Sequence, residues 1–275
     1  MCSSDLPNPK PHTPNPKPQT PDATKLVEHS RIERANIFGS SYIINSKMEF
    51  GYWEVKGQGE ISRLVIAYLG LDVKEVNPKR EEWFGGQKTE IGGDFPNLPY
   101  LKDGDFVITE SSAIPVYLAL KANKPELLGT GAKEQAQVRE IEGVISDINQ
   151  AVYKTIFQKT DYKNSIVKAF EEGGVLHTKI QYLSKFLGEK EFLLGHITLA
   201  DFTLTNSIRV SRALAASFDL ESPYDKHPNL KSTEKKITEL AGVKELLEKR
   251  KSIAYIPAQY TDFKFLNDAE VQSKQ

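Results

Sequence analysis

Residues 94–114 read DFPNLPYLKDGDFVITESSAI, and the rest of the chain is organised around this stretch. Pro96 and Pro99 have no amide hydrogen, so the backbone at these positions is not part of a central strand. The apolar residues that follow lead into an Asp-Gly pair at 103–104, a strong signal for a two-residue hairpin turn. Residues 106–109 then return as the second strand, so the stretch predicts a β-hairpin.

The residues after the hairpin predict a helix with a polar N-terminus. Ser111 and Ser112 precede an apolar run, and serine at such a junction is a helix N-cap signal. Exposed N–H groups at a helix N-terminus are suited to a carboxylate or phosphate. The Leu98–Pro99 bond is a candidate cis peptide that would turn the Leu98 N–H and C=O outward, where an extended peptide could pair with them. These features suggest a small anionic ligand of peptide character, although on their own they favour an ordinary hairpin and a capped helix.

Composition limits the classes of function. The chain has 275 residues, a net charge of −1 and 39% hydrophobic residues, enough for one large or two ordinary domains with a proper core. A charge near zero argues against nucleic acid or an anionic membrane as the main partner. No stretch approaches the roughly 18 apolar residues of a membrane span, and the first residues lack the apolar core of a secretory signal. We therefore expect no nucleic-acid partner and no membrane.

Cysteine and histidine usage argues against a metal. Cys2 is the single cysteine, so neither an internal disulfide nor a thiolate zinc cluster can form. The five histidines are scattered without metal-ligand spacing. We expect no metal and no cofactor, and a reducing compartment, most simply the cytoplasm.

Residues 1–47 are expected to be an extension outside the folded body. The first 21 residues hold seven of the 15 prolines and predict a solvated polyproline-like tail. The sequence Asn-Pro-Lys-Pro occurs at 8–11 and again at 15–18, which leaves open a ligand for a proline-recognition domain. Residues 22–47 fit a short helix or a strand equally well.

The next segment predicts a small mixed sheet. Residues 48–55 are typical of a strand, apolar residues recur with helical spacing from Ile61 to Leu69, and 71–76 predict a second strand. Residues 77–93, with four glycines, read as a long irregular and functional loop before the hairpin. A βαβ unit followed by ββα predicts such a sheet with helices on its faces.

A polar linker at 121–131 leads into a helical region. Apolar residues recur every three or four positions from Val138 onward, and Thr198 with Asp201 has the spacing of a capping box that opens an apolar helix. We expect an all-α bundle with a frayed end beyond about Leu266.

Three motifs together resemble the mu class of cytosolic glutathione transferases: FGYWEVKG at 50–57, GDFPNLPYL at 93–101 and TESSAI at 109–114. The capped segment 194–202 fits the same family, and the resemblance runs from Met48 to Leu266. It implies the glutathione transferase fold, with an α/β thioredoxin-like N-terminal domain at 48–128 and an all-α C-terminal domain at 129–275. It also implies a homodimer that conjugates glutathione, a co-substrate, to small hydrophobic electrophiles.

The resemblance implies specific site residues. Tyr52 matches the family's catalytic tyrosine, whose hydroxyl favours the thiolate by a hydrogen bond to sulfur. Phe95 matches the hydrophobic residue that inserts into the neighbouring subunit. The glutathione-binding positions are Trp53, Trp83, Lys88, Asn97, Leu98, Pro99, Glu110 and Ser111, where Lys88 lies in a loop one residue longer than in the family.

Three positions depart from the family's pattern. Gln58 replaces a leucine, Arg139 replaces an aspartate that reaches across the dimer, and Phe157 replaces a tyrosine that assists the electrophile. Tyr153, one turn away, is the candidate substitute, although a core or surface tyrosine explains it equally well. The expected electrophile site is therefore Tyr153 and Phe157.

Two other functions stay open from the residues alone. A glutathione-dependent isomerase or peroxidase on the same fold would use the same Tyr52. A non-catalytic module that binds apolar ligands would be marked by loss of Tyr52 or Ser111, and both are present.

Overall fold

The computed structural model describes residues 48–157, 161–257, 261 and 263–274. Contacts divide the chain into two units, residues 1–45 and 46–275, and all the described residues belong to the second. The expectations for residues 1–47 lie outside the described residues.

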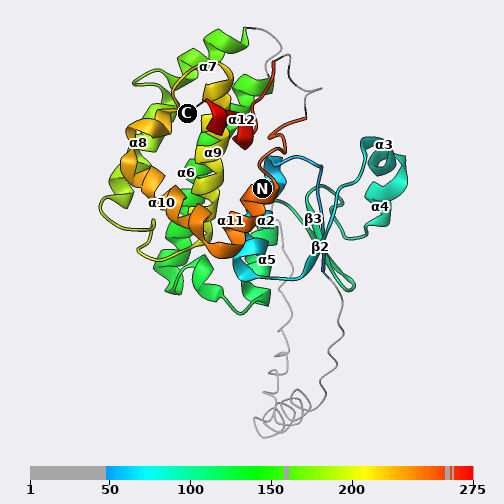
Figure 1. The fold of residues 1–275 in the computed structure, drawn as a ribbon. Coiled ribbons are helices and arrows are strands. Elements are labelled where there is room, and N and C mark those ends of the chain that lie inside the picture. The colour runs from blue at the N-terminus through cyan, green and yellow to red at the C-terminus, as the bar shows by residue number, and fades with distance from the viewer. Residues whose placement is uncertain (1–47, 158–160, 258–260, 262, 275) are drawn as a thin grey trace, which may run out of the picture. The chain divides into compact units, whose positions relative to one another are not determined.

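A four-stranded sheet with the order β2-β1-β3-β4 forms the first part of this unit (Figure 1). Strand β1 (Met48–Gly51) pairs in parallel with β2 (Val73–Val76) and antiparallel with β3 (Tyr100–Asp103). Strand β4 (Phe106–Thr109) completes the predicted hairpin. Because Asp103 pairs with Phe106, the turn itself is Gly104–Asp105, one residue later than expected, with Gly104 at φ 62°.

Two helices of this part follow the predicted pattern. The crossover helix α2 (Glu60–Leu69) buries Leu64 and Val65 and ends at Gly70 with φ 62°, a left-handed cap that suits glycine. Helix α5 (Ala113–Lys121) has Ser112 at its N-cap position. The Ser112 side chain makes no capping hydrogen bond, so the N-cap prediction is right in position and wrong in mechanism.

The segment 77–93 is more regular than the sequence indicated. It contains the short helices α3 (Arg80–Glu82) and α4 (Lys88–Glu90), joined by a π-helical turn η2 (Trp83–Gln87). Gly86, at φ 147°, breaks the helical path inside η2. The Trp83 ring is buried and stacks on that of Tyr100 at 6.3 Å, which ties the segment to the sheet.

Helices make up the remainder of the unit. They are η3 (Pro125–Leu128), α6 (Gly131–Phe157), α7 (Tyr162–Phe170), α8 (Val175–Leu187), α9 (Leu199–Ser217), η4 (Pro223–Lys226), α10 (Pro228–Glu239), α11 (Ala241–Lys249) and α12 (Asp268–Ser273). Helix α9 lies in the middle of the bundle, where most of its side chains are buried (Figure 1).

The predicted cap of α9 is present. The buried Asp201 carboxylate accepts hydrogen bonds from the Thr198 N–H at 2.8 Å, the Thr198 hydroxyl at 3.0 Å and the Leu193 N–H at 2.9 Å. These three bonds join the loop before α9 to its first turn.

Helix α2 connects the sheet to the bundle because it packs against both α9 and α11. At the α11 contact, a Cβ on Gly242 would lie 2.3 Å from the Ala67 carbonyl oxygen, so the two backbones approach closely. One hydrophobic core joins the sheet to α2, α5 and parts of α9 and α11, and a second fills the bundle.

The predicted fraying beyond Leu266 is wrong for the described residues. Residues 268–273 form α12, which packs on α9. The Asn267 side chain caps this helix by accepting the Glu270 N–H at 3.0 Å.

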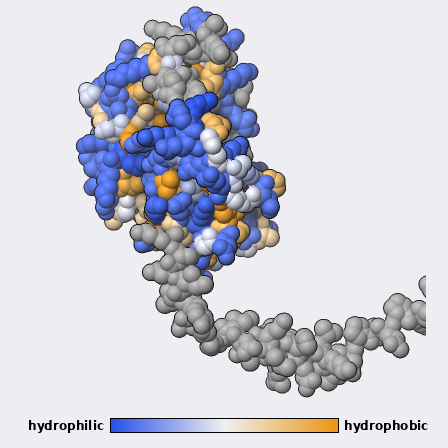
Figure 2. All heavy atoms as spheres, turned by 90° about the vertical axis from the view of Figure 1, so that its right-hand side faces the viewer, coloured by the Kyte–Doolittle hydropathy of each residue, from blue (hydrophilic) through white to orange (hydrophobic). Residues whose placement is uncertain are grey.

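The face of the unit on the side of the sheet is mostly hydrophilic, with small separated hydrophobic patches (Figure 2). Within the described residues, none of the helices combines the length and hydrophobicity that a membrane span needs.

Candidate functional site

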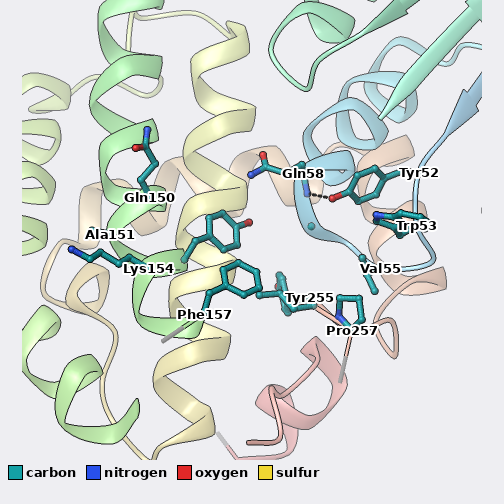
Figure 3. A pocket seen from close by; sticks show the side chains of 13 residues that line it. Tyr52, Trp53, Val55, Gln58, Gln150, Ala151, Lys154, Phe157, Tyr255 and Pro257 are labelled. Carbon is teal, nitrogen blue, oxygen red and sulfur yellow. Dashed lines mark hydrogen bonds between the residues drawn. The ribbon is translucent and has the colours of Figure 1, made fainter. Parts of the chain in front are cut away.

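Tyr52 follows directly after β1 and is held by its neighbours in the next loop. The Tyr52 side chain is buried, and its oxygen accepts a hydrogen bond from the Gln58 N–H at 3.0 Å (Figure 3). Burial raises the pKa of Tyr52 above its ordinary value, so the hydroxyl stays protonated at neutral pH. Since the oxygen already accepts from Gln58, the hydroxyl hydrogen is left to be donated.

Two glycines leave room for this tyrosine. Gly57 has φ 43°, and a Cβ there would lie 2.8 Å from the Tyr52 hydroxyl oxygen. A Cβ on Gly59 would lie 2.6 Å from a ring carbon of the same tyrosine. The G-x-G spacing in residues 57–59 is thus explained by close packing of the loop around the ring.

Arg63 on α2 fixes the loop from behind. Its guanidinium donates to the carbonyl oxygens of Val55 at 2.8 Å, Lys56 at 3.2 Å and Trp53 at 3.1 Å. The guanidinium carbon lies 5.6 Å from the centre of the Tyr52 ring. The guanidinium is also paired with the Glu75 carboxylate at 2.7 Å, so Arg63 holds the loop in place rather than supplying an unpaired positive charge.

A cavity of about 820 Å³ opens in front of Tyr52 between the loop, helix α6 and the segment before α12 (Figure 3). Its lining is mainly apolar and comes from Tyr52, Trp53, Val55, Gly57, Gln58, Gln150, Ala151, Tyr153, Lys154, Phe157, Tyr255, Ile256 and Pro257. A cavity of this volume and lining is typical of a site for a small hydrophobic ligand.

Tyr153 and Phe157 both line the cavity, as predicted, with ring centres 6.3 Å apart. Burial, followed by the proximity of Tyr52, raises the pKa of Tyr153 above its ordinary value. Tyr153 can therefore act as a neutral hydrogen-bond donor. Phe157 supplies an exposed apolar ring, at 54% exposure.

A smaller and more polar cavity of about 160 Å³ adjoins the first, and Gln58, Gln150 and Tyr153 line both. Ser111 and Glu142 are also part of its wall. The Ser111 hydroxyl lies 3.5 Å from the Gln58 side-chain oxygen, so the departure at Gln58 connects the Tyr52 loop to the start of α5.

The hairpin brings further predicted residues to this end of the sheet. The Leu98–Pro99 peptide is cis, as expected, with Leu98 partly buried and Asn97 exposed. Glu110 has φ 76°, uncommon for a residue other than glycine, and its carbonyl accepts the Ala113 and Ile114 N–H groups at 3.1 Å each. This conformation places Ser111 at the helix start.

Seven of the predicted site residues line neither cavity: Asn97, Leu98, Pro99, Glu110, Trp83, Lys88 and Phe95. Trp83 is buried and packs edge-to-face against Trp53, with ring centres 6.2 Å apart. Lys88 opens α4 and lines neither cavity. Phe95 is 78% exposed, and its carbonyl accepts the Thr109 hydroxyl at 2.8 Å. Of the departures, Arg139 pairs with Glu142 at 2.6 Å on the same helix.

Sequence reasoning missed several residues around the site. Gln150 and Lys154 line the cavity beside Tyr153 and Phe157, and their spacing of three and four residues on α6 was a readable signal. Tyr255, Ile256 and Pro257 had no such signal, because they reach the cavity only through the path of the chain after α11.

Among the described residues, no group of three or more histidine, cysteine, aspartate or glutamate side chains is placed to hold a metal ion. The site instead offers a protonated hydroxyl, a polar end at α5 and an apolar cavity. This combination suits a small ligand whose polar end lies near α5 and whose reactive group lies beside Tyr52, next to an apolar compound in the cavity.

Comparisons with known proteins agree with this geometry. The family models "Glutathione S-transferase, N-terminal domain" and "Glutathione S-transferase, C-terminal domain" match residues 48–120 and 146–250. The class-mu 26 kDa glutathione S-transferase isozyme of Schistosoma mansoni is 32% identical over 221 residues, which are 79% of this chain and 95% of that protein. The class-mu 26 kDa isozyme 51 of Fasciola hepatica is 30% identical over 213 residues, 75% of this chain and 91% of that protein. The solved pi-class glutathione S-transferase of Onchocerca volvulus has the same fold, with a TM-score of 0.67 and 22% identity over 78% of this chain and 100% of that one.

Proposed function

This chain belongs to the glutathione S-transferase family, and from that premise we propose that it conjugates the glutathione thiolate to small hydrophobic electrophiles. The observation that carries the proposal is the Tyr52 hydroxyl. It is protonated, it accepts the Gln58 N–H, and it lies on the wall of the apolar cavity.

Tyr52 acts as a hydrogen-bond donor to sulfur rather than as a base. A free thiol has a pKa of about 8.5, so little thiolate forms at neutral pH. A hydrogen bond to the charged form favours it, and a downshift of about two units corresponds to about 2.7 kcal/mol. The thiolate then attacks an electrophilic carbon that the cavity holds nearby, and the bond to the leaving group breaks or a proton is taken up at the neighbouring carbon.

The polar end of glutathione is assigned to the region around α5. Ser111 at the helix start takes the γ-glutamyl carboxylate, Glu110 faces its ammonium group, and the Leu98 backbone beside Pro99 pairs with the cysteinyl unit. Trp53 lines the path to Tyr52, supported by Trp83. Asn97 and Lys88 are assigned to the outer, glycine end of the peptide.

The electrophile lies against Phe157 and Tyr153. Phe157 contributes apolar contact, and Tyr153 donates a hydrogen bond to a polar atom of the electrophile. Tyr255 lines the same cavity, but its hydroxyl is bonded to Asp268 and is therefore not assigned this role.

We further propose a domain division at 48–128 and 129–275, a homodimer with Phe95 at its interface, and a cytoplasmic setting. The end of η3 at Leu128 supports the division, and the match of Phe95 to the family's inserting residue, with a side chain that is 78% exposed here, supports the interface. A single cysteine among 275 residues suits a reducing compartment.

The decisive experiment is the ultraviolet absorbance of bound glutathione thiolate against pH, for the wild type and for Tyr52→Phe. We expect thiolate near neutral pH in the wild type and ionisation near the free value in the variant. Tyr182→Phe, at a 63% exposed tyrosine on α8, is the control and should match the wild type. If glutathione binds to the wild-type protein but its thiol ionises only near the pKa of free glutathione, the chain is a binding module instead.

A substrate panel separates the reactions that share this thiolate. Conjugation of chloronitrobenzene-type electrophiles with release of chloride is the expected activity. Turnover of only ketosteroids or only hydroperoxides would instead assign the isomerase or peroxidase reaction.

A further inference from the structure

The loop that carries the donor to Tyr52 is hydrogen-bonded to the C-terminal segment. The Lys56 N–H donates to the Ala254 carbonyl at 2.9 Å, and the Gly57 N–H donates to the Tyr255 carbonyl at 3.1 Å. Gln58, whose N–H reaches Tyr52, is the next residue. Residues about 200 positions apart in the sequence therefore meet directly beside the catalytic hydroxyl.

The Lys56 side chain extends this connection into the protein. It is 0% exposed, its Nζ donates to Asp268 Oδ2 at 2.7 Å, and it lies 4.3 Å from the centre of the Tyr255 ring. A buried ammonium without a partner is strongly unfavourable. The observed position of Lys56 therefore depends on the carboxylate of Asp268.

Asp268 is the meeting point of three elements. The Tyr255 hydroxyl donates to its Oδ1 at 2.5 Å, and Arg209 on α9 pairs with its Oδ2. Asp268 is the first residue of α12, whose other end is held by Lys274, which donates to the Ala216 carbonyl at 2.9 Å. One carboxylate thus joins the Tyr52 loop, the cavity wall at Tyr255 and the central helix.

We propose that Asp268 is a positioning residue for the transferase reaction: by holding Lys56 and Tyr255, α12 sets the position of the Gln58 N–H against Tyr52. This inference rests on the proposed function and states that thiol activation depends on the C-terminal helix α12. Without the carboxylate, Lys56 must move toward water, and Gly57 and Gln58 move with it. The Tyr52 hydroxyl then loses its fixed orientation, and the thiol of bound glutathione ionises at higher pH.

Other features agree with this role. Burial lowers the pKa of Lys56, and the charge and hydrogen bond of Asp268 oppose that effect. Glu60 on α2 adds a second negative charge near Lys56 and Arg209. The Lys56 position is therefore electrostatically determined from α2, α9 and α12 together.

The test is the thiol ionisation of bound glutathione, with kcat/KM against pH, for Asp268→Asn. We expect the pKa of the bound glutathione thiol to rise by about one unit. At low pH kcat/KM should then fall about tenfold, and it should recover at alkaline pH. The matched control is Asp103→Asn. Asp103 is 6% exposed and, like Asp268, accepts from a tyrosine and pairs with a lysine, Tyr117 and Lys121 at 2.6 Å each, but it lines no part of the cavity in front of Tyr52.

A second, milder variant keeps the inference testable if Asp268→Asn folds poorly. Tyr255→Phe removes only the hydroxyl that donates to Asp268, and we expect a smaller shift in the same direction. Asp268→Glu, which keeps the carboxylate, should partly restore the wild-type pH profile.

The outcomes separate the two proposals. If the wild type itself forms no thiolate near neutral pH, the proposed function fails. If the wild type forms the thiolate and both Asp268→Asn and Tyr255→Phe ionise glutathione as the wild type does, the proposed function stands. Helix α12 would then contribute only to stability. A shift of the same size in Asp103→Asn would also overturn the positioning role.

Discussion

The chemistry of the site depends on the surroundings of one side chain, Tyr52. The Gln58 N–H, the close approach of Gly57 and Gly59, and Arg63 behind the loop fix the position of Tyr52. Burial raises the pKa of its hydroxyl and keeps it neutral. The departure at Gln58 does not disturb this arrangement, because the group that reaches Tyr52 is backbone. Its side chain instead faces Ser111, at the polar end of the site.

Gly57→Ala should impair thiol activation. The backbone there has φ 43°, and the added Cβ would lie 2.8 Å from the Tyr52 oxygen, so the loop or the ring must shift. We expect kcat/KM at neutral pH to fall by about tenfold, from a rise of about one unit in the pKa of the bound thiol. Gln58→Leu is the control, since it keeps the N–H and should leave thiol ionisation unchanged. Equal behaviour of the two variants would contradict this account.

The pH profile of the wild type tests the protonation state of Tyr52. Burial raises the pKa of this hydroxyl, so its proton is retained up to and beyond the ordinary tyrosine value of about 10. The rate should therefore rise as the bound thiol ionises and then stay level to about pH 9.5. Steady-state kcat/KM measured with a non-ionising electrophile would show this plateau. A falling limb with a midpoint below about pH 9 would mean that Tyr52 loses its proton too early.

Among the helices and strands, the sequence pattern predicted those whose formation depends on local sequence. Helix α2, the β3–β4 hairpin and the capped start of α9 all appear where the pattern indicated. The segment 77–93 was read as irregular because its order comes from Trp83, which is buried against the sheet. Helix α12 was missed because its order comes from Asp268, whose partners Lys56 and Arg209 are far away in the sequence. The candidate site was predictable through motifs for Tyr52 and Ser111, but the wall at Tyr255 was not.

Asp201→Asn should lower the stability of the bundle. The carboxylate is buried and accepts three hydrogen bonds, and an amide nitrogen in place of one oxygen would leave at least one buried N–H unpaired. An unpaired buried donor costs about 1–3 kcal/mol, so the midpoint of denaturant unfolding should fall. Asp225→Asn is the comparison, because Asp225 caps η4 through the Ser222 N–H at 3.0 Å while 30% exposed. A larger loss at Asp225 than at Asp201 would show that burial does not govern the effect.

For the unit as a whole, the site is assembled from segments that no single domain contains. The sheet side supplies Tyr52 and Ser111, α6 supplies Tyr153 and Phe157, and the segment before α12 supplies Tyr255. Helix α2 packs against α9 and α11, so it fixes the sheet against the bundle. Activity should therefore depend on residues such as Asp268 that touch neither glutathione nor the electrophile.

Phe95→Ala should weaken the proposed homodimer. Phe95 is 78% exposed, and a second subunit that covered its ring would remove apolar surface from water. Covering a phenylalanine side chain contributes about 1.5–3 kcal/mol, and a symmetric dimer loses one such contact from each subunit, so the dimer dissociation constant should rise by at least about 100-fold. Sedimentation velocity across a dilution series would measure the change. Tyr182→Ala, at a 63% exposed ring on α8, should leave the dissociation constant unchanged, because no interface is proposed there. A wild type that sediments as a monomer at all concentrations, or a variant that dimerises as tightly as the wild type, would remove Phe95 from the interface.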